Sequence, residues 1–374
     1  VINFSPNAVA AIEGVVHDIS ITNCSLEHVG ALAYDNISFN AGGYNITIED
    51  NSITGSGEQH IDIKWLFHDV SIQRNAFLNA PSGAILVNSQ SGGAPGPNPC
   101  YNIEIAYNTM LNCGSGGGTQ NGGVSNTTGS ATTGFYLIHH NLVVANAAAR
   151  DAILIRNFGS INVGVYNNTV INATSGISTQ AGVTATIKNN IATGQSGQPF
   201  LASNSPTENY NDWFPTASAI ILSYAGTTYT SLATYRTATG QGINSISADP
   251  TFDNTVTYDL AQGSPCIDTG LAIPPITDGF FGSAPDMGWR EVGIPPVNIS
   301  AVNVPLASLH PAQVIITWTT NVGSNSQVDY GTTTSYGFSS PLDTTSVTNH
   351  SVTLTNLAPY TLYHFIVKSG GSNG

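Results

Sequence analysis

Charged side chains are scarce in this chain. Only 8% of its 374 residues are Asp, Glu, Lys or Arg, and just eight of these are basic, which leaves a net charge of −14. Proteins that bind nucleic acid without sequence preference need a basic surface. We therefore expect no nucleic-acid partner, and a polar surface made mostly of turns and hydroxyl-bearing strands.

Long apolar runs and cysteine are scarce too. No stretch approaches the roughly eighteen consecutive apolar residues of a membrane-spanning helix, so we expect no transmembrane segment. The four cysteines fit no zinc-site spacing, and their scatter leaves a disulfide open, with Cys100 and Cys113 as the first candidates because they flank one strand. The chain starts at Val1 without a signal peptide, as expected of a processed or truncated start.

One phrase recurs along the first two hundred residues. It is a short run with apolar residues at alternate positions, followed by Asn and another apolar residue, as in Ile46–Ile53 and Val70–Phe77. Alternation with a period of two indicates a half-buried β-strand. The Asn position is held by Cys24 in the first copy and then by Asn51, Asn75, Asn108, Asn141, Asn168 and Asn190.

Spacings of 22 to 33 residues between constant strands indicate a solenoid, here an all-β parallel β-helix. Asn suits the bends because it tolerates the left-handed conformation and can bond its own backbone. Stacked bends would align these residues in a ladder. A β-sandwich with Asn-rich turns is the alternative, but it gives no reason for one phrase to recur seven times.

A second short strand is predicted in most coils, at 31–34, 61–64, 84–88, 152–156 and 176–179. Two insertions rich in Gly and polar residues, 89–99 and 114–133, fall on consecutive coils and should protrude side by side. Such insertions commonly build a binding face. Loops without a function are the alternative.

Residues 206–294 change in character. The stretch 229–236 predicts a helix with Thr230 or Ser231 as its N-cap. It is followed by the phrases Ala-Asp-Pro-Thr-Phe (248–252), Gly-Ser-Pro-Cys-Ile-Asp (263–268) and Asp-Met-Gly (286–288).

With these phrases the chain resembles, over residues 16–291, secreted microbial right-handed parallel β-helix proteins of the pectate-lyase-like superfamily. The resemblance implies a right-handed β-helix over 1–294 with a C-terminal cap at 206–294, and a secreted or cell-surface location. The superfamily contains lyases, hydrolases and non-catalytic surface proteins, so fold alone does not give the activity.

A second domain is predicted after a stiff linker at 295–297. Alternating strands at 314–318, 326–331, 350–354 and 363–368 predict a β-sandwich. Together with Leu357–Tyr363 they resemble a fibronectin type III module over 298–374. The seventh strand of that family is missing before Gly374, either by truncation or because another chain supplies it.

Candidate chemistry centres on one strand of the third coil. Asp62 and Lys64 share a strand face, and by alternation His60 joins them. Lys64 and Arg156 belong to one predicted outward column, three coils and therefore about 14 Å apart. The members of this column are Tyr34, Lys64, Asn88 and Arg156.

A polysaccharide lyase is the first hypothesis. β-Elimination next to a uronate carboxyl group needs a base, for which a desolvated Lys or an Arg-assisted group serves, and a cation such as Ca²⁺, which Asp62 could bind. Segments 61–64 and 83–88 resemble the site strands of alginate-lyase-type β-helix enzymes, which implies Lys64 as the base. Asn88 stands where those enzymes carry the Arg that neutralises the carboxylate, so the resemblance is incomplete.

A glycoside hydrolase is the second hypothesis, since residues 8–9 and 24–30 resemble coils of some β-helix hydrolases. Such enzymes need two carboxylates, about 5–5.5 Å apart for retention or about 6.5–9.5 Å apart for inversion. The nearby candidates are Glu27, Glu58, Asp62 and Asp151.

The third hypothesis is a non-catalytic surface or matrix protein. The pairs Asp62 with Lys64 and Asp151 with Arg156 would then be surface ion pairs that contribute about 0–1 kcal/mol each. Two open ends, at an incomplete first coil (1–15) and at the missing strand, would allow subunits to join head to tail into a fibre. His139 and His140 alternate in direction, so one should lie on the surface and one inside.

In the enzyme hypotheses the engaged partner is an extracellular polysaccharide. The expected catalytic residues are then Lys64, Asp62, Arg156 and His60, and the expected substrate contacts are Tyr34, Asn88 and Asp151.

Overall fold

The computed structural model describes residues 16–27, 35–39, 42–55, 58–64, 66–88, 90–91, 94–95, 100–116, 121–127, 133–157, 159, 161–216, 221–292, 297–305 and 310–370. The chain forms two compact units, Val1–Val292 and Gly293–Gly374. No helix in the described ranges is long and apolar enough to cross a membrane.

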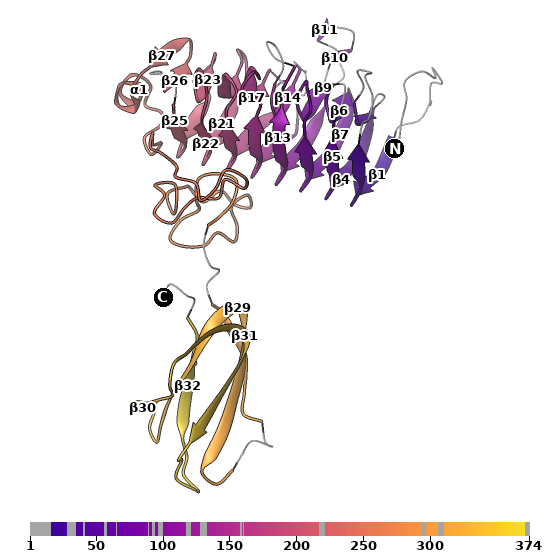
Figure 1. Cartoon of the computed structure of the whole chain (residues 1–374). Helices are drawn as coiled ribbons and strands as arrows, with labels where there is room; N and C mark the ends of the chain where they lie inside the picture. The colour runs from indigo at the N-terminus through magenta and orange to yellow at the C-terminus, as the bar shows by residue number, and fades with distance from the viewer. Residues whose placement is uncertain are drawn as a thin grey trace. The chain divides into compact units, whose positions relative to one another are not determined.

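The first unit is a parallel β-helix of about seven turns built from three sheets, in agreement with the predicted fold class (Figure 1). Every coil contributes one strand to each sheet in turn. Sheet A contains β1 (Val16–Thr22), β4 (Gly43–Glu49), β7 (Phe67–Gln73), β12 (Tyr101–Ala106), β15 (Phe135–His139), β18 (Asn162–Tyr166), β21 (Ala185–Lys188) and β24 (Thr207–Asn209).

Sheet B follows directly after the Asn position. It contains β2 (Ser25–Glu27), β5 (Ser52–Thr54), β8 (Ala76–Leu78), β13 (Thr109–Cys113), β16 (Leu142–Ala145), β19 (Thr169–Ile171), β22 (Ile191–Thr193) and β25 (Asp212–Phe214).

Sheet C contains the predicted second strands. Its parallel members are β3 (Ile37–Phe39), β6 (Ile61–Lys64), β9 (Ile85–Asn88), β14 (Val124–Asn126), β17 (Asp151–Ile155), β20 (Ser175–Thr179), β23 (Phe200–Ala202) and β26 (Leu222–Tyr224), and β27 (Thr227–Tyr229) closes the sheet antiparallel to β26. Strand β14 lies inside the insertion 114–133, which composition had marked as loop. The predicted strand 31–34 lies outside the described residues.

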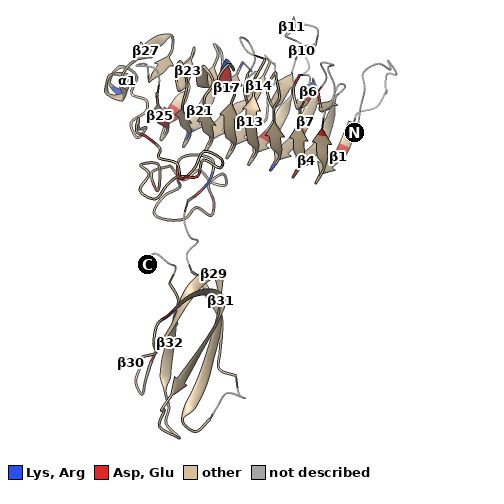
Figure 2. Ribbon diagram, in the orientation of Figure 1, with Lys and Arg blue, Asp and Glu red and all other residues tan. Residues whose placement is uncertain are grey.

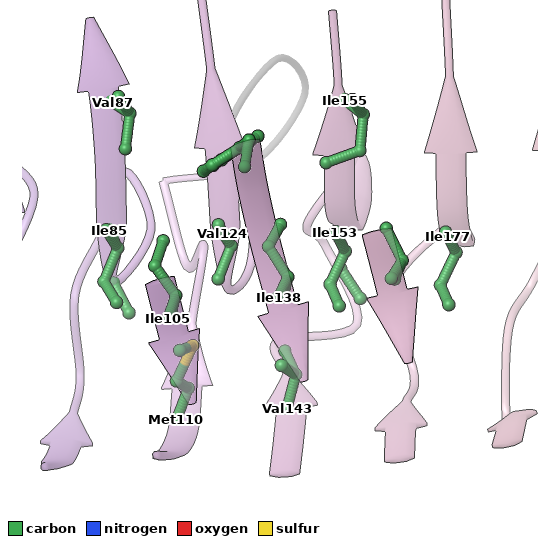
Figure 3. Close-up of a cluster of buried hydrophobic side chains, with 14 of the residues drawn as sticks. Ile85, Val87, Ile105, Met110, Val124, Ile138, Val143, Ile153, Ile155 and Ile177 are labelled. Atoms are coloured by element: carbon green, nitrogen blue, oxygen red, sulfur yellow. The ribbon is translucent and has the colours of Figure 1, made fainter. Parts of the chain in front are cut away.

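The core of the β-helix is a stack of aliphatic side chains from the three sheets (Figure 3). On sheet C the inward column runs through Ile61, Ile85, Val124, Ile153 and Ile177, which pair in register. All five are at most 1% exposed. Alternation with a period of two therefore sends the intervening side chains of each strand outward.

The Asn ladder forms and extends one coil further than predicted. Asn75 Nδ2 donates to Asn108 Oδ1 at 3.0 Å, and Asn108 Nδ2 donates to Asn141 Oδ1 at 2.9 Å. The same bond links Asn190 to Asn211 at 2.9 Å. The backbone N–H of each ladder residue before Asn211 donates to the next Asn Oδ1 as well, as Asn75 does at 2.9 Å, and Asn211 N donates to Ser245 Oγ at 3.1 Å.

The expected reason for Asn at the bend was wrong in one respect. The left-handed residue is the one before the ladder Asn, with φ of 54° at Arg74, 58° at Tyr107 and 53° at His140. The ladder Asn itself has negative φ and points inward, where its amide bonds the neighbouring coils. Side-chain bonding between coils, rather than tolerance of the left-handed region, therefore explains the repeat.

The cap region begins with α1 (Leu232–Thr239), whose N-cap is Ser231 as predicted. The chain then returns along the solenoid without regular strands. Asn189 Nδ2 donates to Leu271 O at 2.8 Å and Asn167 Nδ2 donates to Asp286 O at 2.9 Å, which fastens this segment to the last coils. The four cysteines are free thiols, so Cys100 and Cys113 do not form the disulfide considered above.

The second unit is an antiparallel β domain. The long strand β29 (Gln313–Gly331) pairs with β28 (Ile299–Asn303) and β31 (Asp343–Thr355) in one sheet and with β30 (Phe338–Ser339) and β32 (His364–Lys368) in the other. Its core comprises Ile316, Trp318, Val328, Leu354 and Val367. Within the described residues β32 pairs with β29 alone, and is an edge strand.

Candidate functional site

The outer face of sheet C carries most of the residues singled out from the sequence. Asp62 and Lys64 point outward from β6, and Lys64 lies opposite Asn88 in the strand register. The column continues from Asn88 to Thr127, whose Oγ1 donates to Asn88 Oδ1 at 3.0 Å. One more register step places Arg156 in the same column, three coils from Lys64, as predicted.

An acidic pair with one lysine forms the densest charged cluster of this face. Lys64 Nζ lies 3.3 Å from Asp62 Oδ2 and 3.9 Å from Asp35 Oδ2, and donates to Ser38 Oγ at 3.2 Å. The two carboxylate oxygens are therefore no more than about 7 Å apart, a separation that overlaps both ranges known for glycosidases. Sequence reasoning missed Asp35, because it lies in the turn before β3 and belongs to no repeated phrase.

Burial raises the pKa of both carboxyl groups. Desolvation raises the pKa of Asp62 to about 7, and the Lys64 ammonium offsets only part of that shift. Burial raises the pKa of Asp35 as well. Asp62 Oδ1 is enclosed and makes no hydrogen bond with the residues that the structure describes. A carboxyl group in this state can hold a proton near neutral pH and give it up to a reacting oxygen.

His60 does not join this cluster, contrary to the alternation argument. It precedes β6, and its ring turns into the core, where it stacks on Phe77 with 5.6 Å between ring centroids and is fully buried. Burial lowers the pKa of His60 to about 4, so it is neutral and serves packing. Strand alternation failed here because His60 stands before the first strand residue.

A second charged cluster lies on β17 and its neighbours. Asp151 Oδ2 pairs with Arg150 Nε at 2.6 Å, not with Arg156 as expected, and Asp151 Oδ1 accepts from Ser178 Oγ at 2.5 Å. Arg156 is half-buried and donates to Asn126 O at 2.6 Å. Its pKa is lowered, first by desolvation and then by the neighbouring Arg150. Asp151 thus pairs with Arg150, while Arg156 bonds the backbone of β14.

Charged groups also lie on other strands of the solenoid (Figure 2), and at the end of sheet A Arg74 pairs with Glu49 at 2.6 Å and with Asp50 at 2.9 Å. Tyr34 and most of the two insertions lie outside the described residues; of the first insertion, β10 (Gln90–Ser91) and β11 (Ala94–Pro95) form a short antiparallel pair. Glu27 is exposed on β2 of sheet B, whereas Glu58 is close enough to raise the pKa of Asp62 and Asp35.

The residues around Asp62 do not fit a Ca²⁺ ion. Ca²⁺ takes six to eight oxygen ligands. Here the Lys64 ammonium occupies the position between the two carboxylates that a cation would take. Within the described ranges, no three His, Cys, Asp or Glu side chains are arranged to hold a metal ion. We derive no chemical step from a metal at this site.

Comparison with known proteins informs the second unit alone. Residues 299–374 match the family model described as the purple acid phosphatase N-terminal domain. No curated protein sequence matches the chain. The family match covers the antiparallel β domain and carries no information on the chemistry of the β-helix.

Proposed function

We propose that the chain engages a polysaccharide along the outer face of sheet C and hydrolyses its glycosidic bonds at Asp62 and Asp35. The observation that carries the proposal is the pair of buried carboxyl groups, at most about 7 Å apart, on a face whose cations stand in a column. Because one sugar of an extended chain spans about the same distance as the roughly 4.8 Å between stacked coils, successive sugars would contact successive coils.

Asp62 is the general acid in this scheme. Its raised pKa keeps it protonated near neutral pH, so it can give its proton to the glycosidic oxygen as the C–O bond breaks. Asp35 then removes a proton from the attacking water, or attacks the sugar itself and is released by water in a second step. Lys64, between the two, stabilises the ionised partner.

Hydrolysis suits these residues better than β-elimination. A lysine becomes a base in an apolar pocket or beside another cation. Lys64 instead faces two carboxylates within 4 Å. Arg150 and Arg156, with Asp151 and Asn88 nearby, suit a different task, which is to hold the carboxylate of an acidic sugar beyond the reacting bond. We therefore propose a uronate-containing polysaccharide as the substrate class.

Such a substrate implies an extracellular or cell-surface location. The antiparallel second unit, which we propose to be a fibronectin type III-like module, would then act as a spacer or attachment domain. Its described residues include two paired sheets and a small apolar core, which supports a structural task.

Sugar release from polymer is the direct test. The protein is incubated with polygalacturonate, alginate and a neutral glucan, and reducing ends and ultraviolet absorbance are followed together. We expect new reducing ends without the absorbance of unsaturated products. Asp62→Asn and Asp35→Asn should each lower the rate by about 10²-fold or more, as expected for loss of acid or base catalysis. The matched control is Asp253→Asn, an exposed cap residue.

The expected pH profile follows from Asp62. Activity should fall as pH rises through about 7, because the acid form of Asp62 is then lost. Unsaturated products, or full activity in Asp62→Asn, would contradict the hydrolase proposal.

A non-catalytic binding protein is the second candidate, and one observation favours it. The side chains of Asp62 and Asp35 are only 6% and 7% exposed, so substrate reaches them only if Lys64 moves aside. Binding of the polymers without release of reducing ends would select this candidate, and self-association that depends on concentration would add the fibre-forming role.

A further inference from the structure

The corner between sheets A and B carries a second candidate binding site, on another face from Asp62. The left-handed residue of each coil points outward here, before the inward Asn of the ladder. In the last coils these residues are Asn167 and Asn189, and both hold the returning segment by their amides. One and two coils before Asn167 the residues are His140 and Tyr107, and there the segment borders a half-open cavity of about 360 Å³.

Both aromatic and polar groups line this cavity. Tyr107 is 44% exposed and its ring stacks on His140, with 4.9 Å between centroids. Trp289 and Arg290 face them from the returning segment, with the guanidinium 4.1 Å from the indole centroid. The turn 276–280 completes the lining. A cavity of this size and composition is typical of a small-molecule site.

His140 is held by a relay that the proposed hydrolase does not use. Glu104 Oε1 lies 2.9 Å from His139 Nε2, and His139 Nδ1 lies 3.0 Å from His140 Nδ1. Both histidines are buried, at 3% and 7% exposure, so the expected surface position of one of them was wrong. The returning segment lies at His140, which the alternation of the strand could not predict.

The relay fixes which nitrogen of His140 accepts a hydrogen bond. In the neutral form of His139, the Glu104 carboxylate requires its proton on Nε2, which leaves His139 Nδ1 as an acceptor. His140 must then donate from Nδ1, so its Nε2 carries a lone pair. Among the described residues no group bonds to this Nε2. Burial lowers the pKa of His140 to about 3, which keeps the ring neutral.

Glu291 adds a carboxyl group to the lining. Its Oε1 accepts from the Asp286 N–H at 2.9 Å, its Oε2 is enclosed, and the backbone of Phe281 also bonds to the carboxyl group. Desolvation raises the pKa of Glu291 to about 7, so the carboxyl can donate as well as accept near neutral pH. Arg290 already pairs with Asp259 at 3.0 Å, which removes the net positive charge that an anion would need.

We propose that this cavity binds one pyranose ring of a neutral sugar, with a hydroxyl group bonded to His140 Nε2 and its apolar face against Tyr107. The aromatic face suits the C–H side of the ring, and the remaining His140 nitrogen suits a hydroxyl group, which can both donate and accept. The site lies on sheet A and the cap, so it stands or falls independently of the carboxylates on sheet C.

Binding is measured directly with four single-ring probes. D-Glucose, D-galactose, D-mannose and D-glucuronate are titrated while tryptophan fluorescence is followed, because Trp289 lines the cavity. We expect saturable binding of at least one neutral sugar, and weaker binding of glucuronate. Calorimetry on the same samples gives Kd.

The variants are chosen so that they fold. Asn is well tolerated in the left-handed conformation, so Tyr107→Asn and His140→Asn remove the ring without backbone strain. Each should raise Kd about tenfold or more, which is the loss of one well-formed contact. Arg74→Asn, at the same corner position one coil before Tyr107, is the matched control and should change Kd less than about twofold.

Glu104→Gln tests the relay as a positioning element. The Gln amide can donate to His139 Nε2, which would turn His140 Nε2 into a donor. We expect weaker sugar binding and a protonated Nε2 in the ¹⁵N spectrum of His140, with an unchanged circular dichroism spectrum.

Three outcomes would overturn the proposal. These are no saturable binding of any neutral sugar up to about 0.1 M, which corresponds to negligible affinity, equal Kd in wild type, Tyr107→Asn and His140→Asn, and tighter binding of glucuronate than of all three neutral sugars.

Discussion

At each corner of the β-helix between sheets A and B, two adjacent residues point in opposite directions. The first is left-handed and faces outward, so its side chain is free to vary between Arg74, Tyr107 and His140. The second is an Asn that faces inward and bonds the coils on either side. The outward residues include two that line the proposed sugar site, while the inward ones hold neighbouring coils together.

Loss of one buried ladder residue should be costly. Asn108 is fully buried, receives bonds from Asn75 and donates to Ile72 O and Asn141 Oδ1. Asn108→Ala leaves several of these partners unpaired, so we expect a loss of about 3 kcal/mol or more in the free energy of unfolding. Denaturant unfolding followed by circular dichroism measures it.

The control for this substitution lies in an exposed ladder. Asn112 also bonds its counterparts in neighbouring coils, at 2.7 and 2.8 Å, but its side chain meets water. Because Gly accepts its left-handed backbone, Asn112→Gly should cost less than about 1 kcal/mol. Equal losses in the two variants would show that burial does not matter to the ladder.

At the scale of elements, sheet C shows that register decides more than composition. Strand β14 arises within a stretch of Gly, Ser, Thr and Asn, where no alternation is visible. It forms because β9 and β17 on either side present unpaired backbone groups at the right spacing, and Val124 completes the inward column between Ile85 and Ile153. An unfilled position there would leave a break in the core.

Val124 should therefore matter as much as any strand residue of the core. It is fully buried. Val124→Ala should lower the free energy of unfolding by about 2 kcal/mol, from lost apolar burial and the cavity left behind. Val256, 72% exposed in the cap, gives a matched control whose change to Ala should fall within about 0.5 kcal/mol. A loss at Val124 no greater than at Val256 would mean that β14 is not part of the core.

At the scale of the whole molecule, the protein combines a charge of −14 with carboxyl groups that burial keeps protonated. Desolvation raises the pKa of Asp62, Asp212 and Glu291 to about 7 each. In the unfolded chain these groups lose their protons near pH 4. The folded state therefore binds protons that the unfolded state has released.

These carboxyl groups make the stability of the fold depend on pH. A carboxyl group with a raised folded-state pKa stabilises the folded state fully below its unfolded pKa, and that stabilisation is lost as pH rises through about 7. Burial lowers the pKa of His60 and His140, so these two groups make the fold more stable as pH rises. This gain in stability is complete above about pH 6.5, the pKa of an unfolded histidine. We expect the melting temperature of the β-helix to fall by a few degrees between pH 6.5 and 8.

Calorimetry at several pH values checks this expectation. Asp212 is fully buried and accepts from Ala248 N at 3.1 Å, a bond that Asn can keep. Asp212→Asn should reduce the fall with pH, while the exposed Asp253→Asn should leave it unchanged. A melting temperature that rises over the same interval would contradict the assigned protonation.

The amino-acid sequence by itself determined the solenoid, its ladder and the Lys64–Asn88–Arg156 column, because each follows from a period along the chain that a stacked coil must turn into neighbours in space. It could not show that Asp35 meets Asp62, that His60 turns inward, that Arg150 pairs with Asp151, or that the cap lies at His140. These depend on turns and on a returning segment that have no period, so only tertiary structure decided them. Repetition along the sequence predicts the backbone of the β-helix, whereas these side-chain contacts lie where the repetition is interrupted.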